Sequence, residues 1–245
     1  MKRLFWLFLI AFVLGCGHHR GQLGAGSTLN NSDFDSPPRQ RPYYTATERR
    51  FLALGLVDIQ TLDSSIQVHL VYATPDNFIG EVLYSDFHHA FFLPALAQKI
   101  VAAQQALRSE RPDLSLLILD AVRPLSVQYR MFHLVQGTPN NIYVANPLHG
   151  PGLHNYGAAV DVTIVDSSGN PLPMGSAFDH FGPESHITSE SRLLSSGAIT
   201  RQELDNRKLL RRIMKQQGLQ PLNSEWWHFN LMSRTHARQR LRVVE

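Results

Sequence analysis

The stretch "GLHNYGAAVDVTI", residues 152–164, joins a strand pattern to two side chains of metal-ligand type. Alternation over 158–165 predicts a strand in which Val160, Val162 and Ile164 face the core, while Asp161 faces the other way. His154 lies seven positions before Asp161, and Gly157 permits a turn that brings the imidazole back toward the carboxylate. A histidine held by an aspartate is also a common structural pair, so this segment alone leaves both interpretations open.

The flanking sequence predicts an α+β domain. The expected elements are strands at 66–72 and 114–119, and helices from Pro94 to before Pro112, over 125–137 and over 201–217. Thr200 and Glu203 form a capping box at the start of the last helix, and Gly218 supplies its stop. Strands and helices do not alternate strictly, so we expect one domain with a central antiparallel or mixed sheet flanked by helices.

A second polar segment is "EWWHFNL", residues 225–231, in which a strand pattern places His228 as a candidate third ligand. Glu225 stands at the strand entrance, where its carboxylate can turn into the same cavity. Three protein ligands and a free carboxylate match a hydrolytic zinc site, which keeps a fourth position for water and needs a nearby base. The alternative is that the tryptophans are core residues and Glu225 merely pairs with His228 at the surface.

A third segment, "DAVRP" at 120–124, places Arg123 between a buried strand and a proline that disfavours helix before it. An arginine that leaves a strand end in extended conformation can reach into a cleft. The alternative is a surface salt bridge with Asp120.

The N-terminus has the layout of a secretory signal, with Lys2 and Arg3 before an apolar run that is too short to span a membrane. The only cysteine is Cys16, and "VLGC" at 13–16 resembles the lipobox of bacterial lipoproteins, in which the cysteine carries lipid; a free or buried thiol is the alternative. We expect a signal peptide at 1–15, a flexible tether at 16–45 that is rich in Gly, Ser, Asn and Pro, and a globular domain at 46–245.

Charge does not point to an anionic polymer as partner. The formal net charge is +3, and loss of Lys2 and Arg3 with the signal would leave +3 − 2 = +1. The densest basic cluster, "RKLLRR" at 207–212, has no interleaved aromatic residues and is expected to be the solvated face of a helix. We therefore expect no nucleic-acid partner, and no protein partner is implied.

Six ordered motifs together resemble those of the bacterial zinc D-alanyl-D-alanine dipeptidases, including those of vancomycin resistance, within the DD-peptidase and hedgehog-like fold group. They are "YATPDNFIG" (72–80), "DAVRP" (120–124), "HNYGAAVD" (154–161), "PMGSAFDHFGPESH" (173–186), "NRKLLRRIMKQQG" (206–218) and "EWWHF" (225–229). The resemblance implies one zinc per chain, with His154, Asp161 and His228 as its ligands. It further implies Glu225 as general base and then acid, and Arg123 as the group that stabilises the oxyanion.

Within that fold group, the segment 173–186 resembles the loop that closes the dipeptidase site. By resemblance, Asp179 and Tyr72 would hold the substrate ammonium; a turn cap and a core tyrosine are their alternatives. Three positions depart from the family. The vancomycin-resistance members carry serine two residues before the first histidine, where this chain has Gly152. The two residues after that histidine, Ser and Arg in those members, are here Asn155 and Tyr156. Contacts to the substrate's ends are therefore in question.

The expected function is hydrolysis of D-Ala-D-Ala or a related dipeptide by a zinc metallopeptidase of cell-wall peptide metabolism, held outside the cytoplasm on a bacterial membrane by lipid on Cys16. In a cell with two membranes we expect the periplasmic side of the outer membrane. The alternatives are a DD-carboxypeptidase or endopeptidase that trims longer peptidoglycan stems, and a zinc-binding module without catalysis. The other histidines, such as His88, His89, His180 and His186, are expected to be polar surface groups or groups behind the ligands.

Overall fold

The computed structural model describes residues 43–142 and 144–245. The predicted signal peptide, most of the tether and Cys16 lie outside these residues. Among the described helices, none is both long and apolar enough to cross a membrane.

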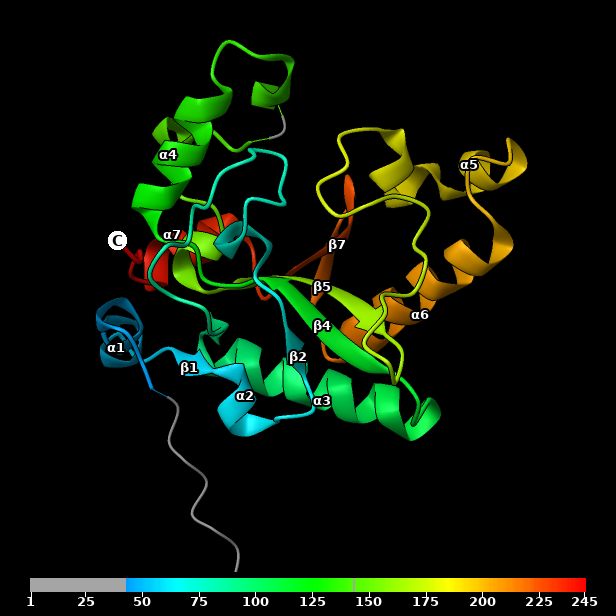
Figure 1. Ribbon diagram of the computed structural model, residues 1–245, viewed down its shortest axis with the longest axis horizontal. Helices are drawn as coiled ribbons and strands as arrows, with labels where there is room; N and C mark the ends of the chain where they lie inside the picture. The colour runs from blue at the N-terminus through cyan, green and yellow to red at the C-terminus, as the bar shows by residue number, and fades with distance from the viewer. Residues whose placement is uncertain (1–42, 143) are drawn as a thin grey trace, which may run out of the picture. The chain divides into compact units, whose positions relative to one another are not determined.

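A five-stranded sheet forms the centre of the domain (Figure 1). Its strands, in spatial order, are β2 (Gln67–Val68), β4 (Ser115–Asp120), β5 (Ala159–Val165), β7 (Glu225–Asn230) and β6 (Gln220–Leu222). β2 runs parallel to β4, whereas the other neighbours are antiparallel. The sheet is therefore mixed, which confirms the predicted α+β class. A separate antiparallel pair joins β1 (Val57–Asp58) to β3 (Phe91–Phe92).

Helices surround the sheet, and their ends follow the local sequence signals. They are α1 (Ala46–Ala53), α2 (Ile59–Leu62), α3 (Pro94–Glu110), α4 (Leu125–Val135), α5 (Glu190–Ser195), α6 (Arg201–Gln216) and α7 (Arg234–Arg240). Pro94 occupies the first turn of α3, where no backbone donor is lost. The capping box of Thr200 and Glu203 is present at the start of α6, as predicted.

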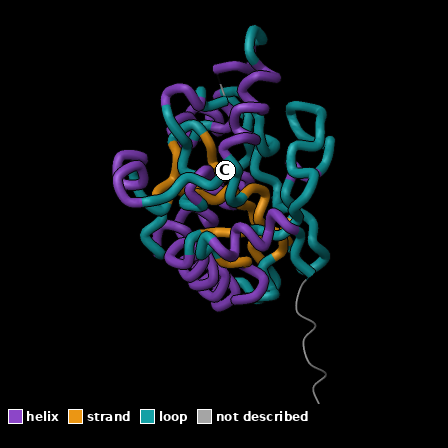
Figure 2. Tube along the Cα trace, turned by 90° about the vertical axis from the view of Figure 1, so that its left-hand side faces the viewer, coloured by secondary structure: helices purple, strands orange, loops and turns teal. Residues whose placement is uncertain are grey.

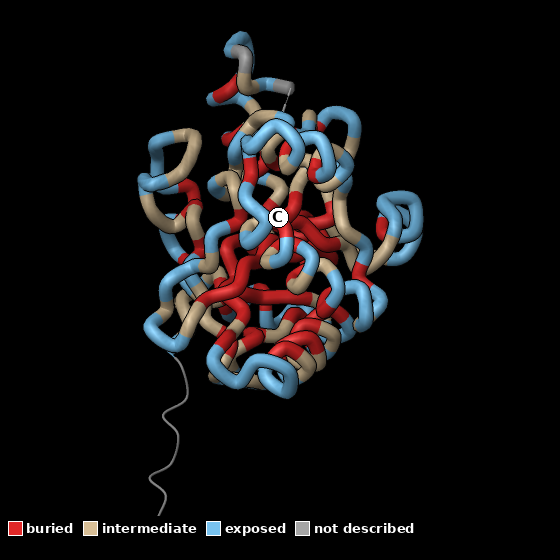
Figure 3. Tube along the Cα trace, turned by 90° about the vertical axis from the view of Figure 1, so that its right-hand side faces the viewer, coloured by how far each residue is buried: buried red, intermediate tan, exposed pale blue. Residues whose placement is uncertain are grey.

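The main core lies between the sheet and the helices α3 and α6, which contact each other and the central strands. Val160, Val162 and Ile164 of β5 belong to this core, together with Ile100 of α3 and Leu210 of α6. Figure 2 shows the strands in the interior with helices and loops around them, and Figure 3 shows the buried segments concentrated there. The opposite face of the sheet carries Asp161 of β5 and His228 of β7, beside a small buried apolar cluster of Leu117, Leu119 and Val165.

The predicted strand at 66–72 is shorter than expected. Only Gln67 and Val68 pair with β4, and the chain then forms a 3-10 turn, Val71–Ala73. Backbone hydrogen bonds of the turn type, from Ala73 N to Leu70 O (2.9 Å) and from Thr74 N to Val71 O (3.1 Å), replace the ladder. The prediction failed because this edge segment has few strand partners, and the turn moves Tyr72 out of the expected alternation.

Candidate metal centre and substrate pocket

A cavity of about 520 Å³ lies at the polar face of the sheet. Strands β5 and β7, the start of α4, the loop 174–186 and the segment 152–155 all contribute to its lining. All seven of the residues predicted to act within the site line this cavity: Tyr72, Arg123, His154, Asp161, Asp179, Glu225 and His228.

Three of these side chains converge closely enough to hold one metal ion. His154, Asp161 and His228 are all buried, and each offers a ligand atom within 4.8 Å of the others. The separations are 3.4 Å from His154 Nε2 to Asp161 Oδ1, 2.8 Å from His228 Nδ1 to Asp161 Oδ1, and 3.2 Å between the two imidazole nitrogens. This is the only group of at least three His, Cys, Asp or Glu side chains with such spacing in the described part of the chain.

The position of each ligand follows from the backbone. Asp161 and His228 are opposite each other in the antiparallel pairing of β5 with β7, so their side chains leave the sheet side by side. His154 lies in a 3-10 turn, His154–Tyr156, that ends at Gly157 with a φ of 64°. A Cβ at Gly157 would lie 3.3 Å from Leu93 N, so both the left-handed backbone and the close approach favour glycine there.

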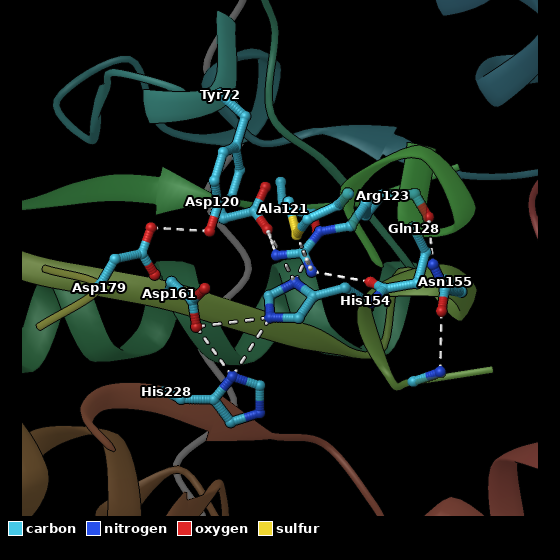
Figure 4. Close-up of polar contacts among 12 residues, drawn as sticks. Tyr72, Asp120, Ala121, Arg123, Gln128, His154, Asn155, Asp161, Asp179 and His228 are labelled. Atoms are coloured by element: carbon cyan, nitrogen blue, oxygen red, sulfur yellow. Dashed lines mark hydrogen bonds and ion pairs between the residues drawn. The ribbon is translucent and has the colours of Figure 1, made fainter. Parts of the chain in front are cut away.

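Hydrogen bonds on the far side of each imidazole direct a lone pair toward the centre. His154 Nδ1 donates to Ala121 O (2.7 Å), and His228 Nε2 donates to Asn230 Oδ1 (2.8 Å). In the neutral rings, His154 Nε2 and His228 Nδ1 therefore carry lone pairs that face each other and the Asp161 carboxylate (Figure 4). Three electron-rich groups in buried contact require a cation between them.

The electrostatics of the site agree with this requirement. Burial alone would lower the pKa of His228, but its hydrogen bond and attraction to Asp161 outweigh burial and raise the pKa to about 9. Burial alone would likewise raise the pKa of Asp161, yet His154 and His228 lower it well below its ordinary value. The raised pKa favours the positively charged form of His228 beside Asp161, so both groups favour positive charge at this position.

Arg123 enters the cavity from the end of β4 and is held on several sides. Its Nη2 donates to Asp120 Oδ2 (2.6 Å) and its Nη1 donates to Gln128 Oε1 (2.9 Å). The predicted alternative of a salt bridge with Asp120 is present, but it is not at the surface, because Asp120 is fully buried. Burial would lower the pKa of Arg123, whereas Asp120 and the nearby phenols raise it, so the guanidinium stays charged inside the pocket.

Tyr72 and Asp179 meet across the cavity although 107 residues separate them. Tyr72 Oη donates to Asp179 Oδ2 at 2.8 Å. Burial raises the pKa of Asp179 well above its usual range, and the hydrogen bond from Tyr72 only partly opposes this effect. A half-buried carboxylate whose pKa is raised by desolvation favours a positive charge beside it, which an ammonium ion would supply.

Glu225 lies beside the ligand group without joining it. Its Oε2 is 3.9 Å from His228 Nδ1, and the carboxylate faces the cavity. Burial raises the pKa of Glu225, with the attraction of His228 acting in the opposite direction. A carboxyl group with a raised pKa next to a cation site is suited to accept and return a proton.

The sequence analysis did not predict the side chains that hold the loop carrying Asp179 in place. Arg207 was expected on a solvated helix face, but its side chain is buried and donates from Nε to Met174 O. Trp226 Nε1 donates to Ser176 Oγ at 2.9 Å. The periodicity of α6 contained a signal, because Arg207 lies three residues after the buried Leu204 and three before the buried Leu210.

The other histidines stand outside the ligand group. His89 Nδ1 lies 2.8 Å from the buried carboxylate of Glu48, and His180 Nε2 lies 3.0 Å from Glu184. His180 and His186 line the cavity at the loop 174–186.

Comparisons with known proteins agree with this geometry. The family model described as D-ala-D-ala dipeptidase matches residues 52–244. The chain is 34% identical over 179 residues to a D-alanyl-D-alanine dipeptidase of Escherichia coli, an alignment that covers 72% of this chain and 84% of that protein. It is 24% identical to a D-alanyl-D-alanine dipeptidase of Enterococcus faecium (74% and 93% covered) and 27% identical to that of Enterococcus faecalis (66% and 83%). With its match spanning nearly the whole described domain, the chain belongs to the D-ala-D-ala dipeptidase family of metallopeptidases, peptidase family M15.

Proposed function

We propose that this protein is a zinc dipeptidase that hydrolyses free D-Ala-D-Ala, or a closely related dipeptide, in cell-wall peptide metabolism. The observation that carries the proposal is the Tyr72–Asp179 pair, which faces the same cavity as the three candidate ligands. An anchor for an ammonium so near the metal centre suits a substrate whose free amine is one residue from the bond to be cleaved. The names of the relatives support the choice of substrate.

His154, Asp161 and His228 would hold one zinc ion per chain. Two nitrogens and one carboxylate oxygen are a donor set of catalytic zinc sites, whose ligands lie about 2.0–2.2 Å from the metal. Such ligands in a tetrahedral arrangement are about 3.3–3.6 Å apart, close to the observed 2.8–3.4 Å. When bound, zinc would acidify a water molecule and polarise the scissile carbonyl.

Glu225 and Arg123 would handle the proton and the negative charge of the reaction. The Glu225 carboxylate accepts one proton from the attacking water and then gives it to the nitrogen of the leaving amino acid as the C–N bond breaks. The Arg123 guanidinium, fixed by Asp120 and Gln128, offers a permanent positive charge to the oxygen that becomes negative in the tetrahedral intermediate. Asp179 and Tyr72 bind the substrate ammonium.

Substrate length tests this function. Acylation of the amine removes its charge and leaves the half-buried Asp179 without a cationic partner, and losing a hydrogen bond to a charged group costs about 1.5–3 kcal/mol or more. We expect free D-Ala-D-Ala to be cleaved at least about a hundredfold better, in kcat/KM, than N-acetyl-D-Ala-D-Ala or a pentapeptide stem, on roughly 2.7 kcal/mol. Comparable values would favour the carboxypeptidase alternative, and bound metal without hydrolysis of any of these would favour the non-catalytic one.

We also propose that Cys16 carries lipid and anchors the domain to a membrane outside the cytoplasm. The proposal is supported by the short apolar run and by "VLGC" directly before a segment with tether composition. In a two-membrane cell, Gly17 after the cysteine is compatible with routing to the outer membrane. Cys16→Ser is expected to abolish both processing and membrane association, measured by fractionation; unchanged fractionation would refute the anchor.

A further inference from the structure

Two arginines line the cavity, and their surroundings differ. Arg123 is half-buried, with 12% of its side chain exposed, and it is paired with Asp120. Arg234 is exposed and forms no ion pair with any described residue; it donates only from Nη2, to Gly150 O (3.0 Å) and Pro151 O (3.3 Å). Within residues 43–142 and 144–245, its Nε and Nη1 groups have no acceptor. Arg234 is thus a cation at the edge of the cavity that is held in place with two donor groups to spare.

The position of Arg234 relative to the ammonium anchor follows from a chain of contacts. Its guanidinium lies against the backbone of 150–151, and the adjacent Gly152 N donates to Asn155 Oδ1 (2.8 Å). Asn155 is in turn fixed by its donation to Arg123 O (2.8 Å). Figure 4 shows Asn155 and Asp179 on opposite sides of His154 and His228. Arg234 therefore belongs to the wall across the metal centre from Asp179.

A free dipeptide in this cavity has a carboxylate to place at that wall. Two extended residues span about 7 Å, so a dipeptide whose ammonium is at Asp179 directs its carboxylate past the metal centre toward the segment 150–155. At that segment, Gly152 offers no side chain, and its N–H is already used by Asn155. A guanidinium pairs well with a carboxylate because its donors match the two oxygens.

We propose that Arg234 binds the free α-carboxylate of the dipeptide and so sets the C-terminal limit of the substrate. This inference rests on the proposed function, because it takes the ammonium end to be at Asp179. An enzyme with such a group discriminates against substrates that have a further residue after the second one. It also discriminates against substrates whose C-terminal carboxylate has been converted to a neutral group. Arg234 acts as a specificity residue and takes no part in proton transfer.

The test compares D-Ala-D-Ala with D-Ala-D-Ala amide, whose C-terminus is neutral, on the full chain. We expect wild type to prefer the free acid by about tenfold or more in kcat/KM. Arg234→Met is expected to lose this preference because its KM for the acid rises, while its KM for the amide stays unchanged. Arg234→Lys is expected to retain part of the preference for the acid. Metal content and Tm should stay at wild-type values.

Arg238→Met is the matched control, because Arg238 lies one turn along α7, also donates to a backbone carbonyl, that of His149, and does not line the cavity. The inference would be overturned, with the proposed function left intact, by either of two results. One is an equal decrease in kcat/KM for the acid and the amide in Arg234→Met. The other is the same selective decrease for the acid in Arg238→Met. Failure of wild type to cleave D-Ala-D-Ala at all would overturn the proposed function and the inference with it.

Discussion

The two walls of the cavity are built in different ways. The metal wall consists of Asp161 and His228, which are paired by the strand ladder, and His154, whose turn is anchored to the end of β4. The loop wall consists of 174–186, in which Asp179 has a left-handed φ of 57°, unusual for a residue other than glycine. Backbone pairing thus fixes one wall, whereas side chains of other elements support the other.

This difference assigns the catalytic chemistry to the metal wall and the choice of substrate to the loop wall. A strand ladder opens only when a large part of the domain unfolds, so the candidate metal ligands keep a fixed geometry. The loop wall depends on a few side-chain contacts from other elements, namely those of Arg207 with Met174 O and of Trp226 with Ser176 Oγ. Changes in the metal wall should therefore affect metal content and kcat, and changes in the loop wall should affect which substrates are accepted.

The largest effect is expected from His228→Ala, which removes a candidate ligand. The variant should lose tight zinc binding, measured by metal analysis after dialysis, and hydrolysis should fall to background. Asn230→Ala leaves the ligand but removes the acceptor of its Nε2 proton. Loss of such a supporting group typically lowers metal affinity or activity about 10- to 100-fold. Zinc bound to His228→Ala as tightly as to wild type would refute the ligand assignment.

Glu225→Ala should keep the metal and lose hydrolysis. General acid–base catalysis contributes about 10²- to 10⁴-fold in rate, and Glu225 stands beside the ligand group without being part of it. Zinc content and kcat measured on the same preparation distinguish a proton-transfer role from a ligand role. A decrease in kcat of less than tenfold would assign proton transfer to another group.

Asp179→Asn should act on selectivity more than on chemistry. The neutral amide can still accept a hydrogen bond from an ammonium ion but provides no negative charge, so kcat/KM for free D-Ala-D-Ala should fall about a hundredfold, while that for N-acetyl-D-Ala-D-Ala should change little. The ratio of the two kcat/KM values is the measurement. An equal decrease on both substrates would mean that Asp179 supports the fold of the loop and does not bind the amine.

The smallest effect is expected from Arg207→Met, which removes the support under the loop wall. Arg207 Nη1 is buried without a hydrogen-bond partner among the described residues. Replacement by an apolar side chain of similar length therefore removes the unfavourable burial of an unpaired Nη1, and it also removes the hydrogen bond to Met174 O. We expect a loss of about tenfold in kcat/KM for the free dipeptide, by analogy with groups that orient functional residues, and unchanged zinc content.

Arg211→Met is the control for Arg207→Met, because Arg211 lies one turn further along α6 and pairs with Glu190 of α5. Its substitution should leave the preference for the free dipeptide intact. A loss of zinc in Arg207→Met would show that the two walls are coupled, against the comparison drawn above.

Local sequence was sufficient for several elements and for naming His154, Asp161 and His228 as candidate ligands, whereas their assignment as one ligand set came from family resemblance. The capping box of Thr200 and Glu203, the position of Pro94 in α3 and the buried strand at β4 depend on neighbours within a few residues, and all were predicted. The strand at 66–72 was predicted too long, because the ladder of an edge strand depends on a partner from elsewhere in the chain. The roles of Tyr72 and Asp179 came from family resemblance and from no local pattern.

The sequence by itself therefore determined the α+β class, the starts of α3, α4 and α6, and the kinds of side chain available for a metal centre. Tertiary structure decided the contacts between distant segments: Tyr72 with Asp179, Arg207 beneath the loop wall, and Arg234 against the segment 150–151. The physical reason is the distance along the chain over which the interactions act. Helix caps and strand alternation arise from interactions within a few residues, whereas the environment of an arginine, buried or free, is set by elements that meet only when the sheet and helices pack.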